Sequence, residues 1–268
     1  MNAQKALVVL LALTISISAF AAPNSYEIKP ESISYQQLLA DSIAQHKNNS
    51  KFDEVEEALR LINANTSQLA PAQIITAIKG NLPTIDANAK IRVLPEMREA
   101  LILKGDQYNR LAAAVAPVLK LYQVEGRVFP LLYRSQQPVA ALIYPNALVF
   151  STRQMDILND NELAALAAHE LPHLIANPLF RKAIDDKDKS AIRTIEFFCD
   201  ATAAATLEML QKNPHCLIDA LYKTEQILEL EYSATDSSGE AHPPLGQRDR
   251  LNKAMTKQFT LIAQATSK

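Results

Sequence analysis

The sequence predicts an α+β fold that is mostly helical, with helices first, then a small sheet, then helices again. Three observations predict it. Apolar residues recur at three- and four-residue spacing from residue 32 to about 123, which is typical of amphipathic helices. Residues 128–152 are rich in Val, Ile, Leu, Tyr and Phe and are interrupted by turn residues, as in short strands. Helical periodicity then returns after Asn159 and lasts almost to residue 268.

Residues 1–21 predict a signal peptide. Lys5 precedes an apolar run from Ala6 to about Ala19, and Ala19-Phe20-Ala21 is a small-x-small cleavage site. The alternative is a short membrane anchor, but the run is shorter than the roughly 20 residues that span a bilayer. We therefore expect a periplasmic or secreted protein with no stable membrane span after signal cleavage.

Charge and cysteine content narrow the class of protein. The 27 basic and 29 acidic residues leave a net charge of −2, and no long basic run occurs, so we expect no nucleic-acid partner. Export would permit a disulfide between Cys199 and Cys216. If a helix begins at Cys199, the few residues between its end and Cys216 can barely bring the two cysteines back within disulfide distance. We therefore expect two free thiols.

The region from residue 22 to 125 is expected to be an N-terminal helical region. "YQQLLADSIAQH", "VEEALRLINA" and "DQYNRLAAAVAPVLKLYQ" have helical periodicity, and Pro117 should kink the last of them. Gly80 and Gly105 follow helical segments as C-terminal caps would. The sequence leaves open whether this region is a prosegment, a lid or a surface that binds a protein partner.

The second region, residues 126–268, is expected to carry the chemistry. It begins with two or three short strands in a small meander, and Asn159-Asp160 with Glu162 predicts the start of a helix. That helix contains His-Glu-x-x-His. His169 and His173 lie one turn apart and can share a metal ion, and Glu170 would lie beside the open position of the metal as a general base.

A third ligand is expected from "AIRTIEFFCDATAAATLEML". Glu196 could complete the coordination sphere, and Asp200, one turn further on, could accept the second N–H of a ligating histidine. The alternative is a solvated acidic stripe, but the helix is so apolar that two carboxylates on it need partners.

These motifs resemble those of the HtpX/Oma-like zinc endopeptidases, metallopeptidase family forty-eight, a gluzincin type. "YPNALVFSTRQMDILNDNELAALAAHE" is similar to the strand and helix that lead to the family's metal motif. "EFFCD" is similar to its third-ligand helix, and "AHPPLGQRDRL" to its later His-Pro segment. The likeness covers about residues 128–251 and implies a zincin-like catalytic domain.

The resemblance implies a role for each residue. His169, His173 and Glu196 would bind one zinc ion per chain, and Glu170 would be the general base. His242 would lie near the substrate carbonyl. Arg250 would bond acidic groups of the site, such as Asp200, with Arg248 as the alternative because the interval after the histidine varies.

The expected function is therefore that of an exported endopeptidase that hydrolyses peptide bonds of a peptide or protein substrate through a zinc-bound water. Pro172 favours an alternative: a catalytically impaired zinc-binding or metal-free scaffold of the same fold that binds a protein partner. Proline removes a helix hydrogen bond and disfavours helical dihedrals at Leu171. The sequence allows either a kinked helix that still binds metal or an extended segment from Leu171 onward.

Overall fold

The computed structural model describes residues 34–48, 52–64, 70–86, 91, 95–232 and 242–266. The predicted signal peptide lies outside the described residues. Among the helices of the described ranges, none is both long and apolar enough to cross a bilayer.

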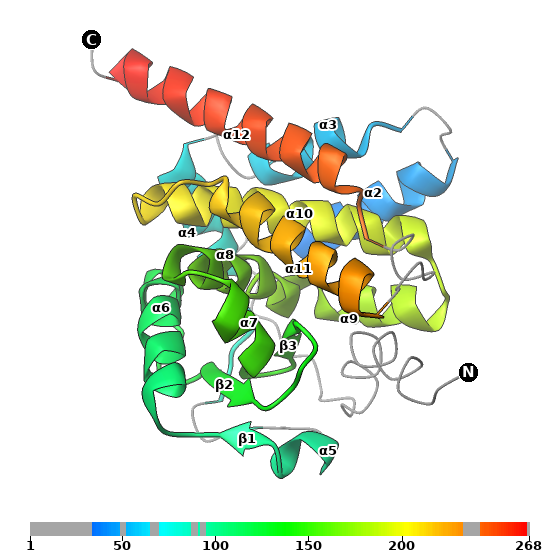
Figure 1. Ribbon diagram of the computed structural model, residues 1–268. Helices are drawn as coiled ribbons and strands as arrows, with labels where there is room; N and C mark the ends of the chain where they lie inside the picture. The colour runs from blue at the N-terminus through cyan, green and yellow to red at the C-terminus, as the bar shows by residue number, and fades with distance from the viewer. Residues whose placement is uncertain are drawn as a thin grey trace.

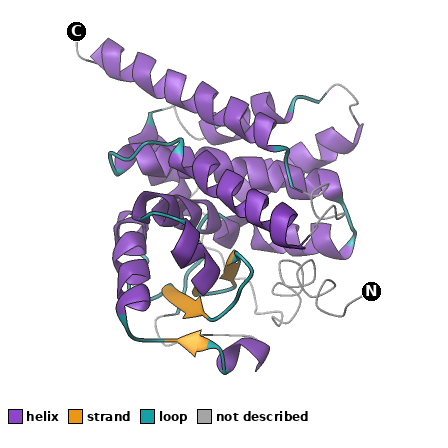
Figure 2. Ribbon diagram, viewed as in Figure 1, coloured by secondary structure: helices purple, strands orange, loops and turns teal. Residues whose placement is uncertain are grey.

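The described chain is mostly helical with one small sheet, as the sequence predicts (Figure 2). Its first part comprises α2 (Tyr35–Asn48), α3 (Glu54–Asn63), α4 (Pro71–Asn81), α5 (Pro95–Arg98), β1 (Leu101–Ile102) and α6 (Asp106–Tyr122). The strands β2 (Phe129–Tyr133), β3 (Ala140–Ile143) and β4 (Ala147–Ser151) follow. The remaining helices are α7 (Thr152–Ile157), α8 (Asp160–Glu170), α9 (His173–Asp185), α10 (Lys189–Met209), α11 (Cys216–Tyr232) and α12 (Leu245–Thr266).

The sheet is mixed, with strand order β1-β2-β4-β3, so the expected meander is wrong in its topology. Strands β3 and β4 form an antiparallel hairpin, but β2 pairs with β4 in parallel rather than with β3. Strand β3 therefore lies at an outer edge of the sheet. Strand β1 joins the other edge from a segment for which the sequence predicted a helix.

Two glycines predicted as helix C-caps behave differently. Gly80 lies within the last turn of α4. Gly105 has φ 102° and precedes α6 as its N-cap residue, so it begins a helix instead of ending one. Its positive φ is a conformation that L side chains rarely adopt, which explains the glycine there. Pro117 lies inside α6, as expected.

Helix α10 is the central element of the helical layer. It packs against α2, α3, α4, α8, α9 and α12, and Figure 1 shows it between the C-terminal helix and the sheet end of the molecule. Buried hydrophobic residues from Tyr35 to Phe259 form one cluster around it. The boundary predicted near residue 125 is therefore not a boundary of the hydrophobic core.

Local signals position the start of α8 as the sequence predicts. The side chain of Asn159 accepts hydrogen bonds from the backbone N–H groups of Asn161 and Glu162, and the Glu162 carboxylate accepts one from the N–H of Asn159. This capping box satisfies N–H groups that a helix leaves without partners at its start.

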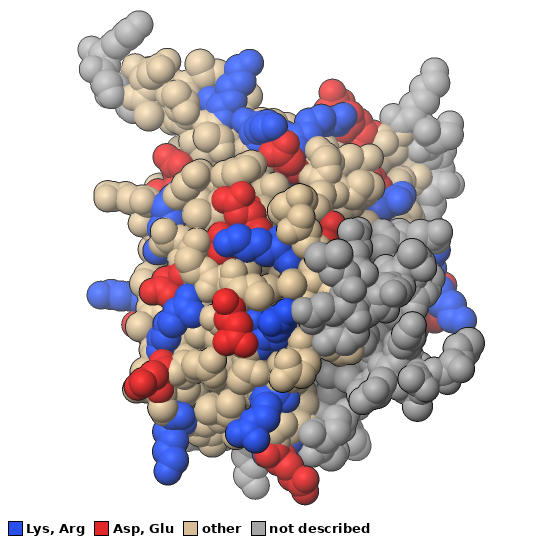
Figure 3. All heavy atoms as spheres, viewed as in Figure 1, with Lys and Arg blue, Asp and Glu red and all other residues tan. Residues whose placement is uncertain are grey.

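The two cysteines agree with expectation. Cys199 and Cys216 are both free. On the face in Figure 3, acidic and basic side chains of the described residues are interspersed and form no large field of one sign.

Candidate metal centre

Three buried side chains from consecutive helices converge at one point. His169 is at the end of α8, His173 is the first residue of α9, and Glu196 is in the first half of α10. One potential ligand atom from each lies within 4.8 Å of those of the other two. The structure thus brings together the predicted His-His-Glu group, which could hold a metal ion.

The distances fit a single small cation. Nε2 of His169 lies 3.3 Å from Oε2 of Glu196, and Nε2 of His173 lies 3.5 Å from Oε1. Ligands about 2.0–2.2 Å from a tetrahedral zinc ion are roughly 3.3–3.6 Å from one another. Both histidines therefore present the same ring nitrogen at the spacing that shared coordination requires.

The proline in the motif does not turn the second histidine away. Leu171 has φ −61° and ψ −41°, and Pro172 has φ −60° and ψ −21°, so both residues keep helical dihedrals. The helix is interrupted in its hydrogen bonding, and α8 and α9 are separate segments, yet His173 stays one turn beyond His169. Of the two alternatives, the helical dihedrals expected of a kinked helix are confirmed, and the extended segment is wrong. Pro178 lies inside α9 and does not end it.

The first histidine is held by a carboxylate and an arginine behind it. Nδ1 of His169 lies 2.9 Å from Oδ1 of Asp200, as predicted, although the ring N–H does not point squarely at that oxygen. Asp200 in turn accepts two hydrogen bonds from Arg248, at 2.7 Å from Nε and 2.6 Å from Nη2. All three side chains are buried.

The site arginine is Arg248, and the prediction of Arg250 is wrong. Arg250 is exposed and pairs with Asp53 at the start of α3. The periodicity of α12 contains the signal that decides between them. Buried Leu251, Met255 and Phe259 lie 3, 7 and 11 residues after Arg248, so Arg248 is on the buried face of that helix and Arg250 is not.

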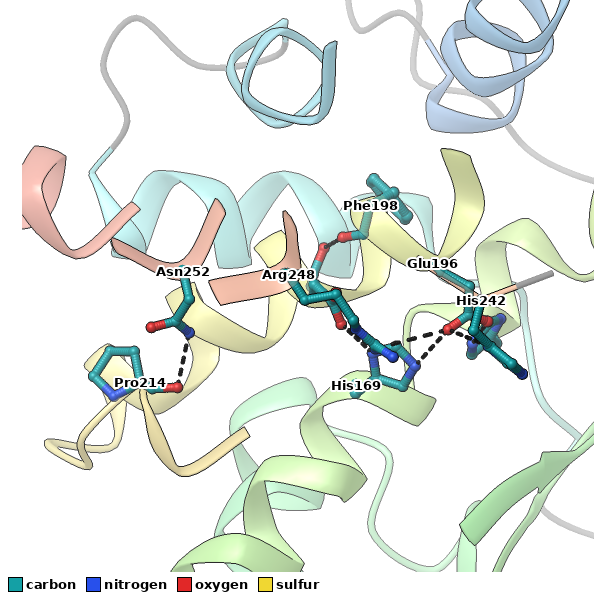
Figure 4. Close-up of polar contacts among 10 residues, drawn as sticks. His169, Glu196, Phe198, Pro214, His242, Arg248 and Asn252 are labelled. Carbon is teal, nitrogen blue, oxygen red and sulfur yellow. Dashed lines mark hydrogen bonds and ion pairs between the residues drawn. The ribbon is translucent and has the colours of Figure 1, made fainter. Parts of the chain in front are cut away.

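His242 also reaches the metal group. Its Nδ1 lies 3.5 Å from Oε2 of Glu196, the same oxygen that faces His169, and its side chain is 45% exposed. Figure 4 shows His169 and His242 approaching Glu196 from opposite sides, with Arg248 behind His169. In the same view, Asn252 donates a hydrogen bond to the carbonyl of Pro214 and ties α12 to the segment before α11. His242 is thus the most exposed of the side chains that lie against Glu196.

Burial and neighbouring charge give the two histidines opposite pKa shifts. Burial lowers the pKa of His169, but the carboxylates of Asp200 and Glu196 outweigh it and raise this pKa to about 10. At His173 burial dominates and lowers the pKa to about 4. The carboxylate of Glu196 opposes this shift but does not outweigh it, and among the described residues Nδ1 of His173 has no hydrogen-bond partner.

The carboxylates of the group stay ionised despite their burial. Burial would raise the pKa of Glu196, but His242 and His169 hold it well below its usual range. Burial would also raise the pKa of Asp200. Arg248 and His169 outweigh this effect, so the pKa of Asp200 is lowered as well. An ionised carboxylate and a neutral His173 are the forms that bind a cation.

Glu170 is in a different environment from the other acids. Its Oε2 accepts a hydrogen bond from the backbone N–H of Leu142 in β3, at 3.0 Å. Burial raises the pKa of Glu170 to about 7, and the positive neighbours only partly oppose this. A carboxyl group with a pKa near neutrality can both accept and return a proton. The contact with Leu142 is through the backbone, and the sequence contained no signal for it.

The chain matches no family model, no curated protein and no solved structure.

Proposed function

We propose that this protein is a zinc-dependent endopeptidase similar to the HtpX/Oma-like metallopeptidases, with a zincin-like catalytic region. The observation that carries the proposal is the convergence of His169, His173 and Glu196, with Glu170 close enough for its pKa to feel the charges of His169 and Glu196. The donor set of two imidazoles and one carboxylate leaves a fourth position open, as in catalytic zinc sites.

The edge of the sheet supports a peptide as the substrate. The N–H of Ser151 donates to the carbonyl of Val139, so these opposite residues are a hydrogen-bonded pair of the β3–β4 ladder. Such pairs alternate along antiparallel strands. The backbone groups of Ala140 and Leu142 therefore point away from β4, toward the side where Glu170 lies. The N–H of Leu142 already donates to Glu170, so an extended peptide would pair with the backbone groups of Ala140 and the carbonyl of Leu142, beside the metal group.

The residues have separate tasks in this proposal. His169, His173 and Glu196 would hold the zinc ion, which supplies Lewis acidity toward the peptide carbonyl and a coordinated water. Glu170 would accept the proton of the attacking water and return it to the leaving amine. His242 would donate a hydrogen bond to the carbonyl oxygen as negative charge develops there. Asp200 and Arg248 would fix the orientation of His169.

The predicted signal peptide supports a periplasmic or secreted location, where the substrate would be an exported peptide or protein.

The decisive experiment compares metal content and proteolysis in Glu170→Gln and the unchanged protein. The substitution should leave zinc binding in place and lower the rate of casein or peptide hydrolysis by about a thousandfold or more, because it removes the proton acceptor. Glu208→Gln, an exposed change on α10, is the matched control and should have no effect.

Other outcomes are equally informative. Zinc bound without cleavage that depends on Glu170 would favour the scaffold alternative. Absence of bound zinc in the purified protein would contradict the metal site itself. Pro172, which suggested the scaffold, no longer favours it, because the two histidines still converge.

A further inference from the structure

The segment that carries His173 lies between two prolines. Pro172 and Pro178 lack a backbone N–H. The carbonyls of Ala168 and Leu174 therefore lose the helix hydrogen bonds that N–H groups at positions 172 and 178 would donate to them. Residues 173–177 are therefore held less firmly by their own helix than an uninterrupted turn would be. As a result, contacts from outside the helix contribute more to fixing the backbone that positions this ligand.

A side chain of the N-terminal region contacts this segment. Nε2 of Gln36, in the first turn of α2, donates a hydrogen bond to the carbonyl of Ile175 at 3.1 Å. Ile175 is two residues beyond His173. Helix α2 packs against both α9 and α10, so this bond lies at the junction of the ligand helices with the N-terminal region.

The start of α2 is itself firmly held. Tyr35 is fully buried, and its ring lies 5.3 Å from that of Phe198 on α10. Its hydroxyl donates to the carbonyl of Ile62, and its backbone N–H donates to the side chain of Asn81. The next residue, Gln36, therefore extends from a fixed backbone and can constrain the segment that it contacts.

The position of the His173 imidazole depends on the local backbone more than the position of the His169 imidazole does. His169 has Asp200 behind its ring, whereas Nδ1 of His173 has no hydrogen-bond partner among the described residues. The ring of His173 is supported by packing on Phe180, whose centroid lies 4.9 Å away. A shift of the backbone at residues 173–177 would therefore move this ligand directly.

We propose that Gln36 is a positioning residue that fixes the proline-flanked segment of α9 and thereby orients His173 toward the metal. The inference rests on the metal site of the proposed function. It gives the N-terminal helices a part in the geometry of that site.

The test compares Gln36→Met with Gln37→Met in the full chain. Methionine keeps the length and helix propensity of glutamine but cannot donate a hydrogen bond. Gln37 is the matched control, because it is exposed and its amide donates to Asp41 within the same helix. The readouts are the zinc dissociation constant, from competition with a chromophoric chelator, and the visible spectrum of the Co²⁺-loaded protein.

Loss of one hydrogen bond to the ligand segment should weaken zinc binding by about fivefold in Gln36→Met and shift the Co²⁺ bands. Gln37→Met should stay within about twofold of the unchanged protein. Gln36→Lys, which restores a donor on a flexible stem, should recover most of the affinity. In a His173→Ala background, Gln36→Met should no longer change the residual Co²⁺ affinity.

Equal effects at positions 36 and 37, no recovery with lysine, or an undiminished effect without His173 would each overturn the inference. If Gln36→Met does not fold, Gln36→Lys is compared with Gln37→Met instead. A zinc affinity of Gln36→Lys well below that of Gln37→Met would then contradict the inference. If the unchanged protein binds zinc and position 36 has no effect, only this inference fails. If the unchanged protein binds no zinc, the proposed function fails as well.

Discussion

At the scale of single residues, the metal group is an arrangement of buried charges that compensate one another. Glu196 and Asp200 are both buried and both have lowered pKa values, and Arg248 lies against them, at 2.6 Å from Asp200 and 3.8 Å from Glu196. A buried ion needs its partner, because water no longer solvates it. Arg248 is therefore the residue on which the ionised form of Asp200 depends most.

We predict that Arg248→Met strongly destabilises the metal-free protein. It would leave Asp200 buried without its bidentate partner, which typically lowers the free energy of unfolding by about 3–5 kcal/mol. Arg250→Met, two residues away on the same helix, removes only an exposed ion pair and should change it by less than about 1 kcal/mol. Urea unfolding followed by circular dichroism measures both, and similar losses in the two variants would contradict the different roles of these arginines.

At the scale of elements, the site is a junction of three helices, and the break between α8 and α9 is part of it. Pro172 removes one hydrogen bond but retains helical dihedrals, so the chain direction continues far enough for His173 to face His169. Leu171 takes the helical conformation that a following proline disfavours. The surrounding core overrides this local preference, since Leu171 and Leu174 are fully buried.

We predict that Pro172→Ala stabilises the protein and leaves the metal site unchanged. Alanine restores the N–H donor and relieves the restriction on Leu171. These gains exceed the cost of a more flexible unfolded chain, so the free energy of unfolding should rise by about 1–2 kcal/mol. Zinc affinity should stay within about threefold, because the dihedrals are already helical. A loss of zinc affinity beyond about tenfold would show instead that the interruption is required for the site geometry.

At the scale of the whole molecule, the metal group is embedded in a core that does not depend on it. Helix α10 contacts helices from both ends of the chain, and one hydrophobic cluster extends from α2 to α12. Small zinc domains unfold without their ion because they have little other core. The large apolar core here supplies the stability of the fold by itself.

We therefore predict that removal of metal abolishes proteolysis but not folding. After treatment with a chelator, the far-ultraviolet circular dichroism should keep its helical shape, and the melting temperature should fall by several degrees. Zinc at a thousandfold excess over its dissociation constant would add about 4 kcal/mol of stability. Calorimetry with and without zinc measures the difference, and loss of the helical signal on chelation would contradict an independent core.

The sequence by itself determined most helices and the candidate ligands. His169, His173 and Glu196 could be chosen because helical spacing converts sequence intervals into shared faces, and Asn159 marked the start of α8 because capping is a local interaction. The mostly helical α+β class followed for the same reason. Local signals were less reliable where a segment was short, as at β1, whose two residues carry too little pattern to tell a strand from a helix.

Only the tertiary structure decided how these pieces meet. Four features depend on contacts between residues far apart in the sequence. They are the parallel pairing of β2 with β4, the choice of Arg248 over Arg250, the bond of Leu142 to Glu170 and the contact of Gln36 with Ile175. Such contacts depend on the packing of whole elements around α10, and no interval within a single element encodes them. The effect of Pro172 was decided in the same way, because buried neighbours hold the chain helical where the local preference of proline would end it.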